Sequence, residues 1–218
     1  MVTLRRWDDR LLRTFVALGA GFMLAAVILK MIPESGRLTQ WTPGLMLAGY
    51  FLIHLFEHTV APHFHFGEET HHMSPAVGAS ALVGLAVHSF FDGLSIGSGF
   101  VVDPALGLLL FFAIVLHKAP EGFTIASIVL AARGTRRQAL LAATAVGAAS
   151  LVGGLLILGA RSLVGVALGL SAGVTLYVAA SDLVPEVNRE GGVIGALTVF
   201  AGVLLYWITE TLLAAAGV

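Results

Sequence analysis

Long apolar segments separated by short polar connections run through almost the whole chain. A helix needs about 20 mostly apolar residues to cross a bilayer. Segments of about this length are predicted at 11–32, 43–61, 76–100, 104–131, 138–159, 163–185 and 193–215. No alternating apolar and polar pattern of the kind typical of strands competes with them. The pattern therefore predicts an all-α, polytopic membrane helix bundle with seven transmembrane helices, forming a single domain over residues 1–218.

The composition agrees with a surface that faces lipid. The 218 residues are 57% apolar and only 11% charged, whereas a soluble domain has about 25% charged residues. The 26 glycines suit close helix packing in lipid, where small residues let backbones approach. A net charge of −1 suggests no nucleic-acid partner, and the absence of cysteine excludes disulfides and thiolate metal ligands.

Arginine is distributed unequally between the two sides of the predicted bundle. Short loops rich in Arg and Lys lie on the cytoplasmic side of a membrane. The side that holds the N-terminus also holds Arg5, Arg6, Arg10, Arg13, Arg133, Arg136, Arg137 and Arg189, whereas the other side holds Arg37 and Arg161. We therefore expect an integral protein of the cell membrane, with a cytoplasmic N-terminus and the C-terminus outside.

The chain also repeats itself at a distance of 152 residues. Segment 20–34 aligns with segment 172–186, and both end in Pro-Glu. Because the two spans are expected to run in opposite directions, the repeat is inverted, as in many secondary transporters. The alignment places Lys30 on Asp182, and we expect these two residues to form a buried ion pair between the two halves.

Two motifs with the same spacing lie in consecutive spans, 29 residues apart. They read His88-Ser89-Phe90-Phe91-Asp92-Gly93 and His117-Lys118-Ala119-Pro120-Glu121-Gly122. Each places a histidine four residues before a carboxylate, and on a helix both side chains then share one face. Ionisable groups inside a span normally line a pathway or pair with one another. We predict a metal site whose ligands are His88, Asp92, His117 and Glu121; the alternative is a structural His–carboxylate network.

Imidazole and carboxylate ligands suit zinc, iron(II), manganese and cadmium, and argue against copper(I). We expect one of these divalent metals, zinc first, as a transported substrate and not as a prosthetic group. The remaining expected partner is the lipid bilayer, and no enzymatic activity is expected.

The two motifs resemble those of the ZIP family of divalent-metal transporters. The family's fourth helix carries a His-Asn-x-x-[Asp/Glu]-Gly type motif, matched by 88–93, and its fifth carries His-x-x-Pro-Glu-Gly variants, matched by 117–122. Segment 62–75 resembles the family's histidine-bearing cytoplasmic loop. The likeness covers the second to eighth family helices, so the first is expected to be absent here. It implies metal uptake toward the cytoplasm by alternating access, and it is compatible with a homodimer.

Two positions depart from the family pattern. Ser89 stands where asparagine is common, and Lys118 stands where some bacterial relatives carry a carboxylate. Relatives with such carboxylates hold two adjacent metal ions. We expect the Lys118 ammonium to replace the second ion by pairing with Asp92 or Glu121, which gives a single-ion site; the alternative is that Lys118 points elsewhere.

Further ligand-type residues precede both motifs in the chain and lie near the expected cytoplasmic side. A His-x-x-Glu-His pattern, typical of inverted zinc proteases, is formed by His54, Glu57 and His58. It favours a metal exit point, with an intramembrane zinc hydrolase as the alternative. The loop that follows offers weak zinc capture, or has no fixed role, through His63, His65, His71 and His72. A third alternative is an exporter of the cation-diffusion-facilitator type, which usually has six spans and a soluble C-terminal domain.

Overall fold

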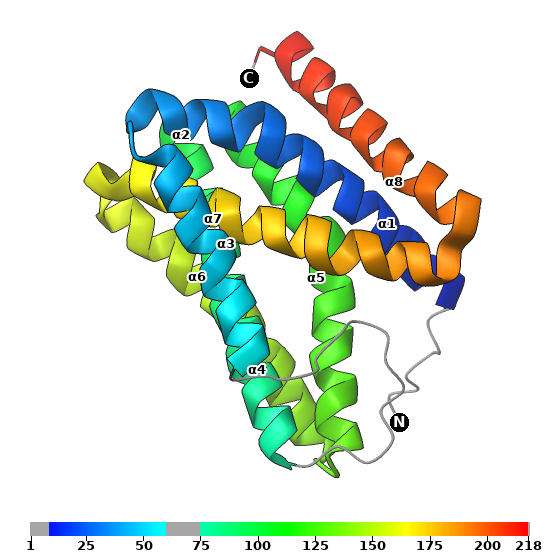
Figure 1. The fold of residues 1–218 in the computed structure, drawn as a ribbon. Helices are drawn as coiled ribbons and strands as arrows, with labels where there is room; N and C mark the ends of the chain where they lie inside the picture. Colours follow the sequence, from blue (N-terminus) through cyan, green and yellow to red (C-terminus); the bar gives the residue numbers. More distant parts are fainter. Residues whose placement is uncertain (1–8, 60–74, 218) are drawn as a thin grey trace.

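The computed structural model describes residues 9–59 and 75–217, and these are helical apart from short connections (Figure 1). The α-helices are α1 (Asp9–Ala26), α2 (Ile32–Leu38), α3 (Thr42–Thr59), α4 (Pro75–Val102), α5 (Pro104–Ala131), α6 (Arg136–Gly159), α7 (Val164–Tyr177) and α8 (Val184–Ala215). Two π-helical turns, η1 (Val27–Met31) and η3 (Val178–Leu183), and a 3-10 turn, η2 (Arg161–Leu163), join some of them. The predicted all-α class is confirmed.

Six helical stretches within the described ranges are long and apolar enough to cross a membrane. They are Leu11–Leu38, Gly78–Val102, Pro104–Ala131, Arg136–Gly159, Arg161–Arg189 and Gly192–Ala215. They match six of the seven predicted spans. The remaining prediction, 43–61, corresponds to α3, which is helical but less apolar because His54, Glu57 and His58 occupy its last turns.

Two predicted spans ended too early, and the reason is the same in both. Helical structure continues past Pro33 into α2 and past Pro185 into α8, because each proline lies in the first turn of the new helix, where its missing N–H is tolerated. In the second of these two spans, the helix changes direction sharply at Gly192, which has φ +50° and ψ −142° (Figure 1). Glycine adopts this positive φ without steric cost.

The two π-helical turns occupy equivalent positions in the 152-residue repeat. In η1 the Val27 carbonyl accepts the Ile32 N–H, and in η3 the Ala179 carbonyl accepts the Val184 N–H. The two donor residues are therefore 152 positions apart, and so are the two acceptor residues. Such turns are rare and often lie at functional sites, so their recurrence gives the predicted repeat a structural counterpart.

The connection between α4 and α5 fixes the register of the two motif-bearing helices. It consists of Asp103 alone, whose carboxylate accepts the Ala105 N–H at 2.7 Å, while Pro104 occupies the first turn of α5. An Asp cap followed by Pro is a strong helix start. The following helix, α6, begins with a reciprocal cap between Thr135 and Gln138. α4 and α5 thus form a tight antiparallel pair that sets the motifs opposite each other.

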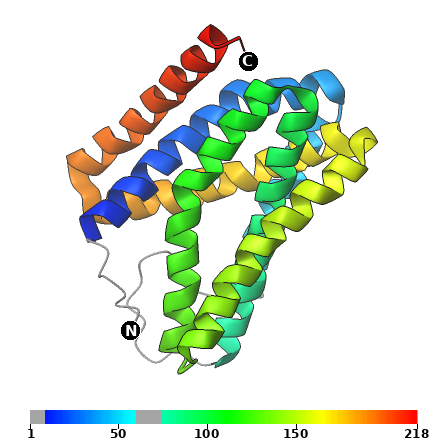
Figure 2. The same ribbon diagram turned by 180° about the vertical axis from the view of Figure 1, so that it is seen from behind.

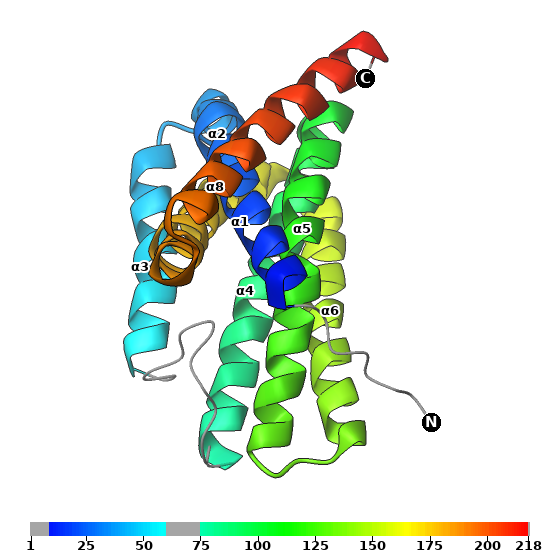
Figure 3. The ribbon, with the colours of Figure 1, turned by 90° about the vertical axis from the view of Figure 1, so that its right-hand side faces the viewer.

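The helices pack in two groups (Figures 2 and 3). The site group comprises α4, α5 and α6, which contact one another; the flank group comprises α1, α2, α3, α7 and α8, in which α1 packs on α8 and α3 on α7. The two groups meet mainly where α5 packs on α1 and α4 on α7.

Reciprocal glycine contacts hold helices together within each group. On α4, a Cβ at Gly93 would overlap the Ser150 carbonyl of α6, and a Cβ at Gly153 of α6 would overlap the Phe90 carbonyl of α4. Equivalent pairs join α1 to α8 and α3 to α7, through Gly21 with Gly202 and Gly49 with Gly173. Such contacts allow close backbone approach.

The predicted ion pair between Lys30 and Asp182 is wrong. The Lys30 ammonium lies 2.8 Å from the Glu210 carboxylate of α8, and Asp182 lines a cavity at the other end of the bundle. An inverted repeat relates equivalent residues across its axis and places them toward opposite ends, so equivalence does not imply contact.

Candidate metal centre

The four predicted ligands come together between α4 and α5. The His88, Asp92, His117 and Glu121 side chains each offer one ligand atom, and these atoms all lie within 4.8 Å of one another. All four residues are buried, with Asp92 and Glu121 only 1% exposed. Across the described residues, no other group of three or more His, Asp or Glu side chains is placed to hold a metal.

Asp92 is the centre of this cluster. Its Oδ2 atom lies 3.4 Å from His88 Nε2 and 3.4 Å from His117 Nε2. Zinc bonds of about 2.0–2.1 Å in a tetrahedron place neighbouring ligand atoms roughly 3.3 Å apart. The two histidine–aspartate distances therefore already match the ligand–ligand distances of a tetrahedral zinc site. Other ligand atoms of the cluster lie up to 4.8 Å apart, so they must move slightly inward to bind the same ion.

Hydrogen bonding prepares His117 to bind a cation. Its Nδ1 lies 3.1 Å from the Ala113 carbonyl, and a carbonyl only accepts hydrogen bonds, so the proton is on Nδ1. The Nε2 lone pair then faces the cluster, where it has no hydrogen-bond partner. A backbone partner on the second ring nitrogen is the usual way in which proteins orient a metal-binding histidine.

The cluster is not satisfied by protein groups alone. His88 Nδ1 and Asp92 Oδ1 are buried without a hydrogen-bond partner in the described part of the chain. A buried polar group left in this state costs about 1–3 kcal/mol. These unpaired atoms, together with the donor set of two imidazoles and two carboxylates, fit a divalent cation.

Lys118 pairs with both carboxylates, as predicted. Its ammonium lies 2.8 Å from Asp92 Oδ2 and 2.6 Å from Glu121 Oε2. It also donates to the Ser89 hydroxyl at 2.6 Å, which in turn donates to Glu121 Oε1 at 2.6 Å. Ser89 and Lys118 thus belong to one network with the acidic ligands, and with neutral histidines the network carries one net negative charge.

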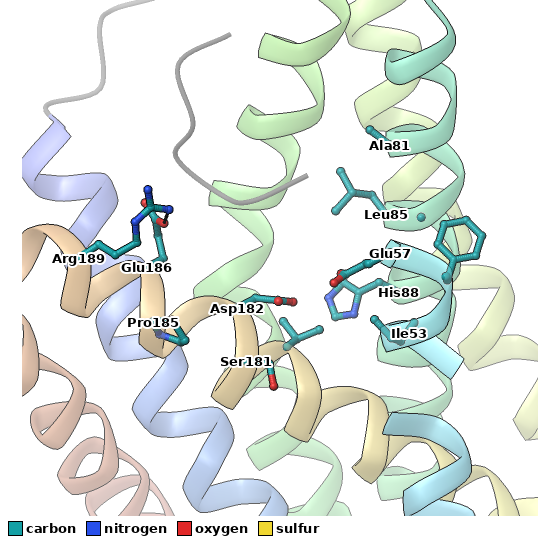
Figure 4. A pocket seen from close by; sticks show the side chains of 13 residues that line it. Ile53, Glu57, Ala81, Leu85, His88, Ser181, Asp182, Pro185, Glu186 and Arg189 are labelled. Atoms are coloured by element: carbon teal, nitrogen blue, oxygen red, sulfur yellow. Dashed lines mark ion pairs between the residues drawn. The ribbon is translucent and has the colours of Figure 1, made fainter. Parts of the chain in front are cut away.

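A cavity of about 250 Å³ leads away from the cluster on one side (Figure 4). It begins at His88, whose side chain is 8% exposed, and reaches Arg189, whose side chain is 61% exposed. Glu57 and Asp182 point into the space between them (Figure 4). The role of Asp182 as a cavity residue was missed from the sequence, although its place in the repeat had marked it as a polar position within a span.

The His-x-x-Glu-His pattern on α3 does not assemble a metal site within the described ranges. His58 Nδ1 lies 2.7 Å from the His54 carbonyl, and the two rings stand 4.2 Å apart. Glu57 faces the cavity instead. The four predicted loop ligands, His63, His65, His71 and His72, lie outside the described residues.

Comparisons with known proteins agree with the motifs. The sequence model of the family described as "ZIP Zinc transporter" matches residues 67–216. The chain is 30% identical over 161 residues to Zinc transporter ZIP9-B of Xenopus laevis, covering 67% of this chain and 52% of the relative. It is 31% identical over 163 residues to Zinc transporter ZIP9 of Micropogonias undulatus, covering 67% and 51%. The chain thus spans about half the length of the curated relatives it matches.

Proposed function

Because the chain belongs to the ZIP family of zinc transporters, we propose that it moves a divalent metal ion, zinc first, across a membrane toward the cytoplasm. The buried cluster of His88, Asp92, His117 and Glu121 carries this proposal. Ionisable residues inside a membrane span are costly unless they serve a pathway or pair with one another. Neutral imidazoles and carboxylates accept iron(II), manganese and cadmium as well as zinc, so these remain candidate substrates.

The position of the cavity supports a direction for release. It joins His88 to the exposed end of the bundle at Arg189, which belongs to the arginine-rich side. This side is cytoplasmic by the charge rule. An ion that leaves the cluster through the cavity passes Glu57 and Asp182, whose carboxylates can bind it transiently. The resulting topology has a cytoplasmic N-terminus and an external C-terminus.

The packing in two groups supports alternating access. Reciprocal glycine contacts tie helices together within the site group and within the flank group. The cluster belongs entirely to the site group, since its ligands come from α4 and α5. Movement of the site group along α1 and α7 carries the bound ion from one side of the flank group to the other. A homodimer through the flank group is compatible with this arrangement.

The Lys118 contacts support a single-ion site. An ammonium within 2.8 Å of both carboxylates occupies the space and satisfies the charge that a second divalent ion requires. When zinc binds, the ammonium either stays beside the ion and repels it, or turns away and loses its ion pairs with Asp92 and Glu121. Both effects weaken zinc binding. A weakened site releases its ion more readily, which suits transport.

Zinc flux into proteoliposomes tests this function. The wild-type chain should accumulate radioactive zinc, and the His88→Ala variant should lose at least nine tenths of the initial rate because one imidazole ligand is missing. Glu57→Ala should keep measurable uptake, since Glu57 lies in the cavity and not in the cluster. Absence of flux in the wild type, or full uptake by His88→Ala, contradicts the proposal. Zinc uptake toward the cytoplasmic side by the wild-type chain also argues against the two alternatives, an intramembrane hydrolase and an exporter.

A further inference from the structure

Buried hydroxyl groups lie on α4 and α7, two helices through which the site group and the flank group meet. The described residues include eleven buried polar or charged side chains. Five belong to the cluster and its lysine network: His88, Ser89, Asp92, His117 and Glu121. Ser35 and Thr42 bond to each other at 2.8 Å. The remaining four are all hydroxyls of α4 and α7, namely Ser95, Ser98, Ser171 and Thr175.

Helix periodicity places Ser95 in line with the cluster on α4, and Ser98 about one turn further along the helix. Ser95 follows His88 by seven residues and Asp92 by three, so it continues their face of α4 by a further turn. Ser98 follows by another three residues. Ser171 of α7 donates to the Phe91 carbonyl of α4 at 3.2 Å, which shows that α7 packs on α4 at the level of Asp92.

Ser95 and Ser98 lie on the opposite side of the cluster from the cavity. The cavity is lined on α4 by residues that precede the cluster, from Ala81 to His88. Ser95 and Ser98 lie beyond the cluster, toward Asp103 at the end of α4. An ion that crosses the membrane through the cluster must pass both sides, and in this conformation Ser95 and Ser98 are buried.

Two of these hydroxyls have no partner. Ser95 and Ser98 are 1% and 0% exposed, and neither Oγ makes a hydrogen bond in the described part of the chain. A serine in a membrane helix usually bonds to a carbonyl of its own preceding turn, as several exposed threonines do here. A buried hydroxyl without a partner is destabilising, and a passing hydrated ion offers both serines the hydrogen bonds that they lack.

We propose that Ser95 and Ser98 line the second half of the ion path, as a hydroxyl track for a partly hydrated divalent cation. The inference rests on the proposed transport function. Neutral hydroxyls hydrogen-bond the water shell of the ion and do not hold the metal as carboxylates do, so the ion passes without being trapped. The track opens to water when the site group moves, and it is closed between α4 and α7 in this conformation.

The absence of cysteine from the chain makes the track directly testable. Ser95→Cys and Ser98→Cys are prepared in the full chain, in sealed membrane vesicles, and a small membrane-impermeant thiosulfonate reagent is added on the side of Asp103. Both cysteines should react at least tenfold faster than a Ser150→Cys control. The Ser150 hydroxyl is also buried without a partner, but Ser150 lies at the glycine contact of α4 with α6 inside the site group. Gly36→Cys, exposed on α2 with no neighbour near its Cβ, reports access of the reagent to that side.

Labelling rates equal to that of Ser150→Cys, with Gly36→Cys fully labelled, overturn the track. Because labelling needs no metal, its result is independent of zinc flux. Flux without labelling therefore rejects the track and keeps the transport function, whereas labelling without flux keeps a water-accessible path and rejects transport. A double variant, Ser95→Ala with Ser98→Ala, should lower zinc uptake several-fold at unchanged equilibrium zinc binding, and an unchanged uptake rate contradicts the track.

Discussion

At the scale of single residues, Lys118 decides how much charge the cluster can offer to an ion. Its ammonium contacts Asp92, Glu121 and Ser89 at 2.6–2.8 Å. Two carboxylates with one ammonium leave a net charge of −1, so a bound divalent ion gives +1. Without the lysine the same ion would give a neutral site, which is the better trap.

Replacing Lys118 with Met should therefore raise zinc affinity at least tenfold and slow turnover. A unit charge a few ångströms from a divalent ion is worth several kcal/mol even at an effective dielectric constant of about 20, and Met keeps most of the side-chain length. Equilibrium zinc binding and flux measure the two effects. Lys118→Arg, which keeps the charge, should stay close to wild type, and equal affinities for Met and wild type contradict this role.

A second substitution at the same position tests the number of ions. Lys118→Asp removes the ammonium and adds a carboxylate beside Asp92 and Glu121, so the variant should bind two zinc ions per chain where wild type binds one. Metal analysis of the purified, desalted protein gives the ratio. Two ions in wild type would defeat the single-ion site.

The sequence predicted residues that share one helix face and missed pairings between distant helices. The grouping of the four predicted ligands follows from His-x-x-x-carboxylate spacing on two adjacent helices, because helical geometry determines which side chains lie together. The partner of Lys30 is Glu210, 180 positions away in the sequence on α8. No spacing rule connects these two residues, since their contact depends on how α1 and α8 cross.

At the scale of helices, glycine contacts set how closely paired helices approach, while hydropathy and capping set where a helix begins and ends. Helix bounds were well predicted where hydropathy and capping agree, as for α5, which was expected at 104–131 and begins and ends there. The π-helical turns were not predicted, because they are defined by backbone hydrogen bonds that no residue pattern in these segments specifies. Their positions follow from the inverted repeat only after the structure is known.

The α4–α6 contact should be sensitive to a single methyl group. Gly153→Ala places a Cβ against the Phe90 carbonyl and should destabilise the protein by about 1–3 kcal/mol, the usual cost of overpacking. Gly147→Ala on the same helix meets nothing within 4 Å and serves as the control. Thermal unfolding in detergent should show a lower midpoint temperature for Gly153→Ala only. Equal midpoints for the two variants would mean that α4 and α6 accommodate the added methyl group without loss of stability.

At the scale of the whole molecule, the proposed transport requires the site group to move against the flank group. A cysteine pair replacing Gly19 and Leu116 should trap the groups together, because a Cβ at Gly19 lies 3.5 Å from the Leu116 Cβ, within disulfide range. Oxidation should stop zinc flux and reduction should restore it.

A matched pair within one group provides the comparison. A Cβ at Gly78 lies 3.4 Å from the Ala132 Cβ, and both residues belong to the site group or its adjoining turn. The cross-link between Gly78→Cys and Ala132→Cys should leave flux unchanged. If both cross-links stop flux equally, or neither does, the two groups do not move as separate bodies.

The most direct test of the account is zinc X-ray absorption of the purified, zinc-loaded chain, combined with metal analysis. The predicted result is one zinc per chain with two imidazole ligands and oxygen ligands at about 2.0–2.1 Å. The double variant His88→Ala with His117→Ala should lose both the imidazole signal and most of the bound zinc. Zinc without imidazole scattering in wild type, or unchanged zinc loading in the double variant, would contradict a metal site formed by His88, Asp92, His117 and Glu121.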